Sequence, residues 1–178
     1  MKKILVYTCL VIFFLFLSFV LITNASASEQ SLVSLSSGAF LIEKPAGYSL
    51  TFYGFYIMDE NPETGWCSQE GEISDHIFVF ELAEETVLNY LEFDTAYVDT
   101  EGSGAKDILV ELSKENPTEG FQELASVSLQ DQQDKQQFPV TNELSGRWLR
   151  MTILNNHGSA EYTELMDFRA YGEQLTET

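Results

Sequence analysis

Cysteine is scarce in this 178-residue chain, and its scarcity excludes several ways of stabilising a fold. The two cysteines are Cys9 and Cys67. Cys9 lies in an N-terminal apolar run that we expect to be removed, so Cys67 would stand alone in the mature protein and could form no internal disulfide. A zinc or iron–sulfur cluster held by several thiolates is excluded for the same reason. The fold must therefore be held by packing, assisted at most by a bound metal ion.

Basic residues are scarce as well. Nine Lys and Arg stand against 28 Asp and Glu, which gives a formal net charge of −19. Phosphate groups would be repelled by such a chain, so the charge argues against nucleic acid and against anionic lipid surfaces as partners. It is compatible with neutral glycans, cationic partners and divalent cations. The alternative is that the acids serve only the solubility of an exported domain.

Sequence signatures of common catalytic sites are missing too. The chain has no Gly-x-Ser-x-Gly elbow, no His-Glu-x-x-His and no glycine-rich phosphate loop. Of the two histidines, His76 lies in an apolar, strand-like run, and His157 lies in the loop "NNHGS", where it could contact a ligand. Two carboxylates can hydrolyse a glycoside, but among 28 acids some pair always looks suitable. We expect a protein that is not an enzyme.

The one long apolar run stands at the N-terminus. Two lysines precede "ILVYTCLVIFFLFLSFVLI", and the small residues "ASA" that end at Ala27 match a signal-peptidase site. We therefore predict a signal peptide over residues 1–27 and a secreted or periplasmic protein that starts at Ser28. The run is about 19 residues long, between the ~15 of a long signal core and the ~20 of a membrane span, so an uncleaved anchor with membrane contact is the alternative.

Beyond this run, short β-prone segments alternate with turn signals such as "DENPETG", "KENPTEG" and "NNHGS". "DILVELS" alternates most clearly, with Ile108, Val110 and Leu112 on one face. Roughly eight short strands without a helical period predict an all-β sandwich or jelly roll. The expected strands are "SLTFYGFYIM", "DHIFVFEL", "TVLNYLEFDT", "DILVELS", "FQELASVSL", "KQQFPV", "RWLRMTIL" and "TELMDFRAYG".

The acidic loop "DTEGSG" begins like the calcium loop of a helix-loop-helix site. Asp99, Glu101 and Ser103 stand at alternate positions, and a glycine follows in sixth place. The twelfth position, which needs a bidentate glutamate, is Val110 and has no oxygen to offer. We therefore predict a turn here.

The loop "DENPETGW" is a better candidate for a cation site. Asp59, Asn61 and Thr64 offer hard oxygen ligands within six residues, and Pro62 stiffens the loop. One loop cannot supply the six to eight oxygens that calcium takes, so a second segment would have to contribute. The alternative is a turn capped by Asp59 and Asn61.

Five segments resemble, in order, the motifs of discoidin, or coagulation-factor type C, domains. "MDENPETGW" resembles the family's I-D-G-N-x-x-T-x-W segment, "GRWLRMTILNNHG" resembles A-R-Y-V-R-I, and "LMDFRAYG" resembles the closing L-A-E-V-E-V-Y-G. "TVLNYLEFDT" and "AKDILVELS" resemble strands between them. The resemblance implies a galactose-binding-like jelly roll over residues 45–172, preceded by a leader at 28–44 and followed by a tail at 173–178.

The same resemblance implies a structural calcium ion. The acid of the closing motif completes the site because the first and last strands lie close together, and Glu164 is a less favoured substitute for it. Two positions differ from the family: Glu60 stands in place of a glycine, and Asp167 in place of a glutamate. The implied metal ligands are Asp59, the backbone around Asn61, Thr64 and Asp167.

The resemblance also assigns structural roles. Trp66 matches a tryptophan that packs in the core, and we expect Trp148 in a core position as well. Arg147 and Arg150 match arginines that support the fold.

The function that the resemblance implies is a carbohydrate-binding module. Its ligand contacts would come from loops at one end of the sandwich, because loops vary while strands hold them rigidly. The alternative is a protein-interaction or cell-envelope adaptor domain without a sugar ligand. A lipid-binding role ranks third, because the loops are polar and insertion into a membrane would need exposed apolar side chains on them. The candidate ligand contacts are Tyr97, Asp99, Asn155, Asn156 and His157.

Overall fold

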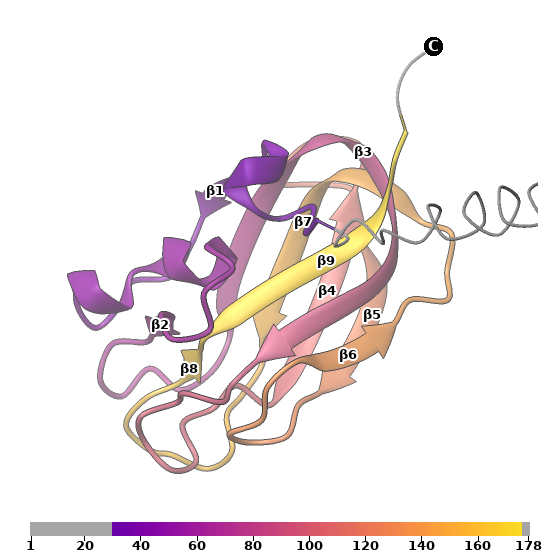
Figure 1. Ribbon diagram of the computed structural model, residues 1–178. Helices are drawn as coiled ribbons and strands as arrows, with labels where there is room; N and C mark the ends of the chain where they lie inside the picture. Colours follow the sequence, from indigo (N-terminus) through magenta and orange to yellow (C-terminus); the bar gives the residue numbers. More distant parts are fainter. Residues whose placement is uncertain (1–29, 176–178) are drawn as a thin grey trace, which may run out of the picture.

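The computed structural model describes residues 30–175 (Figure 1). The predicted signal peptide and the start at Ser28 lie outside the described residues. Between residues 30 and 175, no helix is long and apolar enough to cross a membrane.

Strands dominate the described part of the chain, and three short 3₁₀ helices accompany them. The strands are β1 (Phe40–Glu43), β2 (Trp66–Cys67), β3 (His76–Asp94), β4 (Asp107–Ser113), β5 (Gln122–Ser128), β6 (Gln136–Pro139), β7 (Ser145–Ile153), β8 (Glu164–Leu165) and β9 (Asp167–Gln174). The helices are η1 (Leu35–Ser37), η2 (Leu50–Phe52) and η3 (Gly54–Met58).

The long strand β3 joins the two layers of the sandwich (Figure 1). Its first half pairs with β1 and β7, which continue through β4 to β5, while its second half pairs with β9 and β6. All of these pairings are antiparallel. Phe80 in the first half of β3 contacts Phe168 of β9 across the layers, with ring centroids 5.7 Å apart. The predicted all-β jelly-roll sandwich is therefore confirmed.

The core between the layers is apolar and follows the alternation of the strands. Ile108, Val110 and Leu112 of β4 are all buried, as their spacing predicted. Trp66 is fully buried, which also confirms the prediction. Trp148 is only half-buried, so its predicted core position is wrong. It lies in β7 opposite Glu81, on the side of the strand that alternates away from the core residue Leu149.

The segment "SLTFYGFYIM" does not form the predicted strand; it forms η2 and η3. Ser49 accepts a hydrogen bond from the backbone N–H of Thr51, which starts a 3₁₀ turn. The aromatic residues favoured a strand by composition, but this local cap and Gly54 at the start of η3 break the extended chain. "DHIFVFEL" and "TVLNYLEFDT" also differ from expectation, since they form the single strand β3.

The fold extends beyond the predicted boundaries at residues 45 and 172. Within the segment predicted as a leader, Val33 is fully buried, and the backbone N–H of Leu32 donates to the carbonyl of Ala170 over 2.7 Å. The strand β1 also lies there, and β9 runs to Gln174 at the other end. The serine-rich composition suggested a loose leader, whereas side-chain caps and pairing with the last strand hold this segment in the fold.

Candidate functional site

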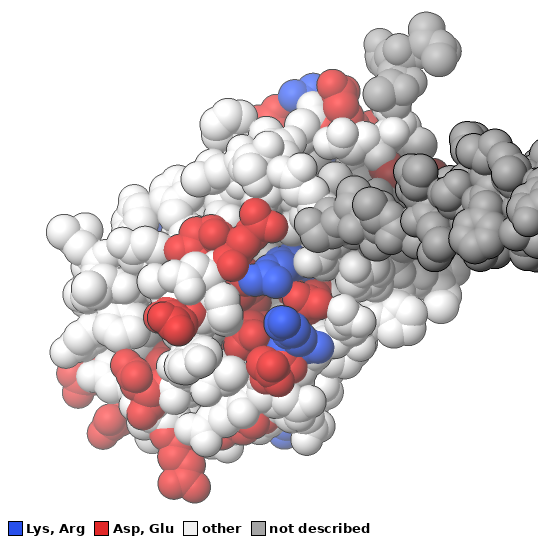
Figure 2. Space-filling view, viewed as in Figure 1, with Lys and Arg blue, Asp and Glu red and all other residues white. Residues whose placement is uncertain are grey.

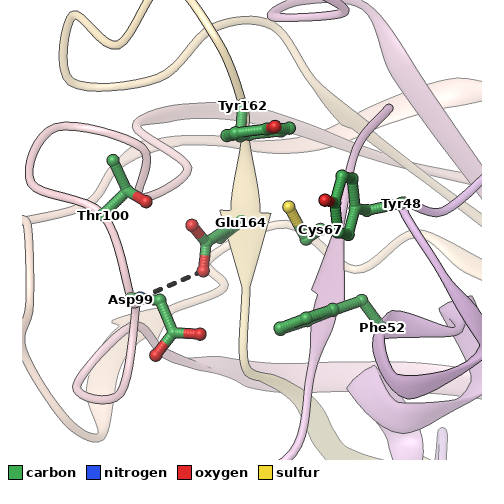
Figure 3. A pocket seen from close by; sticks show the side chains of 7 residues that line it. All are labelled: Tyr48, Phe52, Cys67, Asp99, Thr100, Tyr162 and Glu164. Atoms are coloured by element: carbon green, nitrogen blue, oxygen red, sulfur yellow. Dashed lines mark hydrogen bonds between the residues drawn. The ribbon is translucent and has the colours of Figure 1, made fainter. Parts of the chain in front are cut away.

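A small pocket opens between three loops at one end of the sandwich (Figure 3). Its cavity volume is about 190 Å³. The short strands β2 and β8 form its floor, because Cys67 pairs directly with Glu164. We call it the Tyr48–Tyr162 pocket, and its lining residues are Tyr48, Phe52, Cys67, Asp99, Thr100, Tyr162 and Glu164.

One wall of the pocket is aromatic. The rings of Tyr48 and Tyr162 meet edge to face with centroids 5.4 Å apart, and Phe52 meets Tyr48 at 6.3 Å. The 3₁₀ turn of η2 brings Phe52 back toward Tyr48. The backbone N–H of Tyr48 donates to the carbonyl of Cys67 over 2.9 Å, which fixes this wall to the floor. Tyr48 remains 56% exposed, so its ring is available to a ligand.

The opposite wall is acidic. Glu164 is only 2% exposed, and its Oε1 accepts a hydrogen bond from Ser103 Oγ over 2.7 Å. Its Oε2 accepts from the backbone N–H of Asp99 over 3.1 Å (Figure 3). Glu164 thus holds the loop after β3 in place and faces that loop with both oxygens. Asp99 itself is exposed and adds a second carboxylate to the lining.

The acidic side chains make the electrostatic potential in the pocket negative. Burial, followed by the charges of Glu164 and Asp99, raises the pKa of the Cys67 thiol to about 12. The pKa of Tyr162 is raised by desolvation and, next, by the charge of Glu70. Acidic side chains are spread over the face seen in Figure 2, where the few basic groups lie among them. The Cys67 thiol is therefore protonated at neutral pH and is a poor nucleophile.

The predicted contacts Asn155 and Asn156 serve the loop structure. Asn155 Nδ2 donates to Asp107 Oδ2 over 2.8 Å, and its Oδ1 accepts from the backbone N–H of Asp107 over 3.2 Å. Asn156 Nδ2 donates to the carbonyl of Tyr162 over 2.8 Å. Asn156 therefore helps to position a wall of the pocket without lining it. Whether either amide contacts a ligand stays a prediction.

The remaining predicted contacts lie in different surroundings. Asp99 lines the pocket, whereas Tyr97, two residues earlier, is 54% exposed and does not. His157 is half-buried, its backbone N–H donates to the carbonyl of Gly104, and its Nε2 is buried without a hydrogen-bond partner. The structure thus brings one of the five predicted ligand residues into the pocket.

The loop at residues 59–64 forms the capped turn that was the alternative to a cation site. Asp59 Oδ1 accepts from the backbone N–H of Asn61 over 2.9 Å, and Asp59 Oδ2 accepts from Thr64 Oγ1 over 2.8 Å. Glu60 has a φ of 63°, in the left-handed region that favours glycine. That conformation explains why a glycine suits this position in the motif that the segment resembles.

Asp167 lies close to this turn, as the resemblance implied. It is 2% exposed, and its Oδ1 has no hydrogen-bond partner. Burial raises its pKa to about 7, Arg169 opposes the shift, and the charge of Asp59 adds to it. Arg169 Nη2 lies 2.5 Å from Asp167 Oδ2 and donates to the carbonyl of Glu60 over 3.0 Å. The guanidinium therefore ties the turn to the last strand.

These residues suit a hard cation by their donor chemistry. The buried carboxylate of Asp167 has one oxygen, Oδ1, without a partner, while Oδ2 is ion-paired with Arg169. Asp59 and Thr64 add oxygen atoms of the kind that calcium prefers. No group of three or more His, Cys, Asp or Glu side chains suited to a metal occurs in residues 30–175. A calcium ion would therefore need hydroxyl and carbonyl oxygens as well. Calcium binding stays a prediction.

Most residues of the pocket were missed in the sequence. Phe52 was assigned to a strand, Tyr48 just before it was not singled out, and Glu164 was considered only as a substitute metal ligand. Tyr162 stands in the loop "SAEYTEL", where one aromatic among polar residues is a weak signal. The capping pattern of Ser49 and Thr51 would have indicated a turn and so a loop rich in aromatic residues.

Comparison with known proteins places the chain among sandwiches of this type. Residues 56–174 match the family model described as Sad1 / UNC-like C-terminal. No curated protein matches the sequence significantly.

Several solved structures share the fold. A fragment of a protein named as a chitobiase, from Bacteroides thetaiotaomicron, superposes with a TM-score of 0.72 at 17% identity, covering 88% of this chain and 99% of its own. Chitosan-binding module 1 of a chitosanase/glucanase from Paenibacillus sp. IK-5 superposes with a TM-score of 0.62 at 16% identity, covering 80% of this chain and 99% of its own.

The family 32 CBM of NanJ from C. perfringens, solved with galactose, gives a TM-score of 0.62 at 9% identity, with 80% of this chain and 98% of that chain covered. These likenesses confirm the predicted discoidin-like, galactose-binding-like fold.

Proposed function

The chain belongs to the Sad1/UNC-like C-terminal family, and from this premise we propose that it is an exported, non-catalytic carbohydrate-binding domain. The ligand lies in the Tyr48–Tyr162 pocket. The observation that carries the proposal is the pairing of an aromatic wall with an oxygen-rich wall around one small cavity. The signal-like N-terminus supports export.

The chemistry of the two walls suits a sugar. One face of a pyranose ring carries C–H groups that pack on an aromatic ring, such as that of Tyr48 or Tyr162. Its hydroxyl groups can donate to the carboxylates of Asp99 and Glu164 and to Thr100 Oγ1. The cavity of about 190 Å³ is below the ~300–1,000 Å³ of sites for drug-sized ligands, so it suits a single sugar unit.

The structural neighbours support the same proposal. One is a chitosan-binding module and another was solved with galactose, and both have this sandwich fold. They are carbohydrate-binding modules, which supports a non-catalytic role.

Titration calorimetry with a panel of mono- and oligosaccharides tests the proposal. Tyr162→Ala removes one ring of the pocket and should weaken binding about tenfold or more, as for other buried aromatic anchors. Tyr97→Ala is the matched control, because Tyr97 is exposed on a neighbouring loop but does not line the pocket. If only Tyr97→Ala weakened sugar binding, the ligand would instead bind at the loop of Tyr97 and Asp99 that the sequence analysis predicted. No binding of any sugar would refute the proposal.

A protein-interaction role is the second candidate, and one observation favours it. Phe40 and Ile42 of the edge strand β1 are 60% and 45% exposed, and Leu50 is 84% exposed. Exposed apolar side chains beside an unpaired strand edge suit association with another protein. Phe40→Lys would then abolish partner binding while leaving sugar binding unchanged, which a pull-down from envelope extracts combined with calorimetry would measure.

We also propose that the 59–64 turn and Asp167 hold a calcium ion. Asp59, Thr64 and Asp167 would supply side-chain oxygens, and the backbone near Asn61 would supply carbonyls. The positive charge of the bound ion would offset the electrostatic repulsion between the carboxylates of Asp59 and Asp167. Its role would be structural, since it would link the first loop to the last strand.

A further inference from the structure

We infer that the Tyr48–Tyr162 pocket selects a sugar that carries a protonated amine, a glucosamine-type unit, over neutral or N-acetylated sugars. This inference rests on the proposed function and adds the charge of the ligand to it. Two carboxylates, three aromatic rings and no basic side chain line the cavity.

The carboxylates have acceptor capacity left for an ammonium group. Each oxygen of Glu164 accepts one hydrogen bond from the protein, from Ser103 Oγ or from the backbone of Asp99. A carboxylate oxygen can accept about two hydrogen bonds, so each keeps a free lone pair. An ammonium group has three N–H donors and no acceptor, which matches a wall made of acceptors.

The field inside the pocket favours a cation. The two carboxylates both raise the pKa of Cys67, which lies on the floor between the acidic and aromatic walls. Burial is the larger cause of that shift, and the position of both carboxylates in the lining places their negative charge at the cavity. The faces of the Tyr48, Phe52 and Tyr162 rings carry negative charge of their own and attract cations.

A neutral sugar would leave this charge uncompensated. Its hydroxyl groups can donate to the carboxylates, but they bring no positive charge to offset the two negative ones, whereas an ammonium group adds Coulomb attraction to its hydrogen bonds. An N-acetyl group removes the positive charge and adds bulk to a cavity of about 190 Å³. The pocket should therefore separate glucosamine from N-acetylglucosamine by charge and by size.

The test compares glucosamine trimers and N-acetylglucosamine trimers by calorimetry with the exported, mature protein at pH 6, where the amine is protonated. We expect the glucosamine trimer to bind at least about tenfold more tightly. Asp99→Asn should remove most of this preference, and the substitution is mild because Asp99 is exposed and its side chain makes no hydrogen bond that the fold requires. Glu164→Gln should do the same, and its melting curve checks that the loop is intact. Glu63→Gln, an exposed acid outside the pocket, is the control.

The outcomes separate the two claims. Equal binding of both trimers, lost in Tyr162→Ala, would overturn the charge preference and leave the proposed function standing. A preference for glucosamine that persists in an Asp99→Asn, Glu164→Gln double variant would reflect adsorption to the acidic surface and would also overturn the inference. If neither trimer nor any neutral sugar binds, the proposed function fails together with the inference.

Discussion

Removal of the Trp66 side chain should cost more stability than any other single truncation near the pocket. Trp66 is fully buried in the core. Its ring lies edge-on to His76 and Phe78, with centroids 4.8 and 5.2 Å away. Its Nε1 donates to the carbonyl of Ala46 over 3.3 Å. The side chain therefore joins β2, the start of β3 and the chain before η2.

The magnitude follows from these contacts. Trp66→Ala should lower the free energy of unfolding by about 3–5 kcal/mol, as large aromatic truncations in cores do. Trp66→Phe keeps most of the ring packing but leaves the Ala46 carbonyl without its donor. The lost hydrogen bond should lower the free energy of unfolding by about 1 kcal/mol, in addition to the cost of any cavity that the smaller ring leaves. Trp148→Ala is the matched control, and its cost should stay at about 1–2 kcal/mol because part of the side chain is already in water.

Urea unfolding followed by far-UV circular dichroism measures all three variants without relying on tryptophan fluorescence. The slope of free energy against urea concentration should stay constant, which indicates that only stability has changed. A loss below about 1 kcal/mol for Trp66→Ala would show that the side chain contributes little packing. A larger loss for Trp148→Ala than for Trp66→Ala would refute the reasoning from burial.

Three further predictions concern the ion, the pH and the N-terminus. Calcium at about 100 times its dissociation constant should stabilise the fold by about 2.7 kcal/mol. Asp59→Ala should abolish this stabilisation, whereas the control variant Glu63→Ala should keep it. Identical calorimetric melting curves with calcium and with chelator would contradict the site. Burial lowers the pKa of His76 in the folded state, so the unfolded state binds a proton at this side chain more tightly than the folded state does. His76 should therefore reduce stability as the pH drops below ~6.5, whereas Asp167, whose pKa is raised to about 7, acts in the opposite direction. The free energy of unfolding of wild type should fall relative to that of His76→Phe as the pH drops; parallel pH profiles would show that His76 is not responsible. Mass spectrometry of the exported protein should find Ser28 at its N-terminus, and a retained apolar segment would show an anchor instead.

The sandwich was predictable because alternation is a local property of the sequence. Ile108, Val110 and Leu112 repeat at every second position, and such spacing places them on one face wherever the strand lies. The length of β3 was not predictable, since "DHIFVFEL" and "TVLNYLEFDT" each have the length of a separate strand. The pairing with β7 is irregular between Glu81 and Thr86, and the pairing with β9 begins only at Thr86, so the chain continues as one strand because its two flanks are paired.

The turn at 59–64 and its nearness to Asp167 were also predictable, because the motif carries its own caps. Arg169 was not foreseen as the group that contacts Asp167, since the pairing depends on where β9 places two side chains. The Tyr48–Tyr162 pocket escaped prediction because its walls come from segments about a hundred residues apart. The pairing of β2 with β8, together with backbone hydrogen bonds such as that from Ser68 to Thr163, brings those segments together.

Chemical-shift mapping by NMR tests the central claim most directly. The ¹⁵N-labelled mature domain would be titrated with the sugar that binds most tightly in the calorimetric panel. The account predicts shifts confined to residues 48–52, 67, 99–104 and 161–164, around the pocket. Shifts centred on Phe40 and Ile42 of β1, or no shift with any sugar, would contradict the claim that this pocket binds carbohydrate.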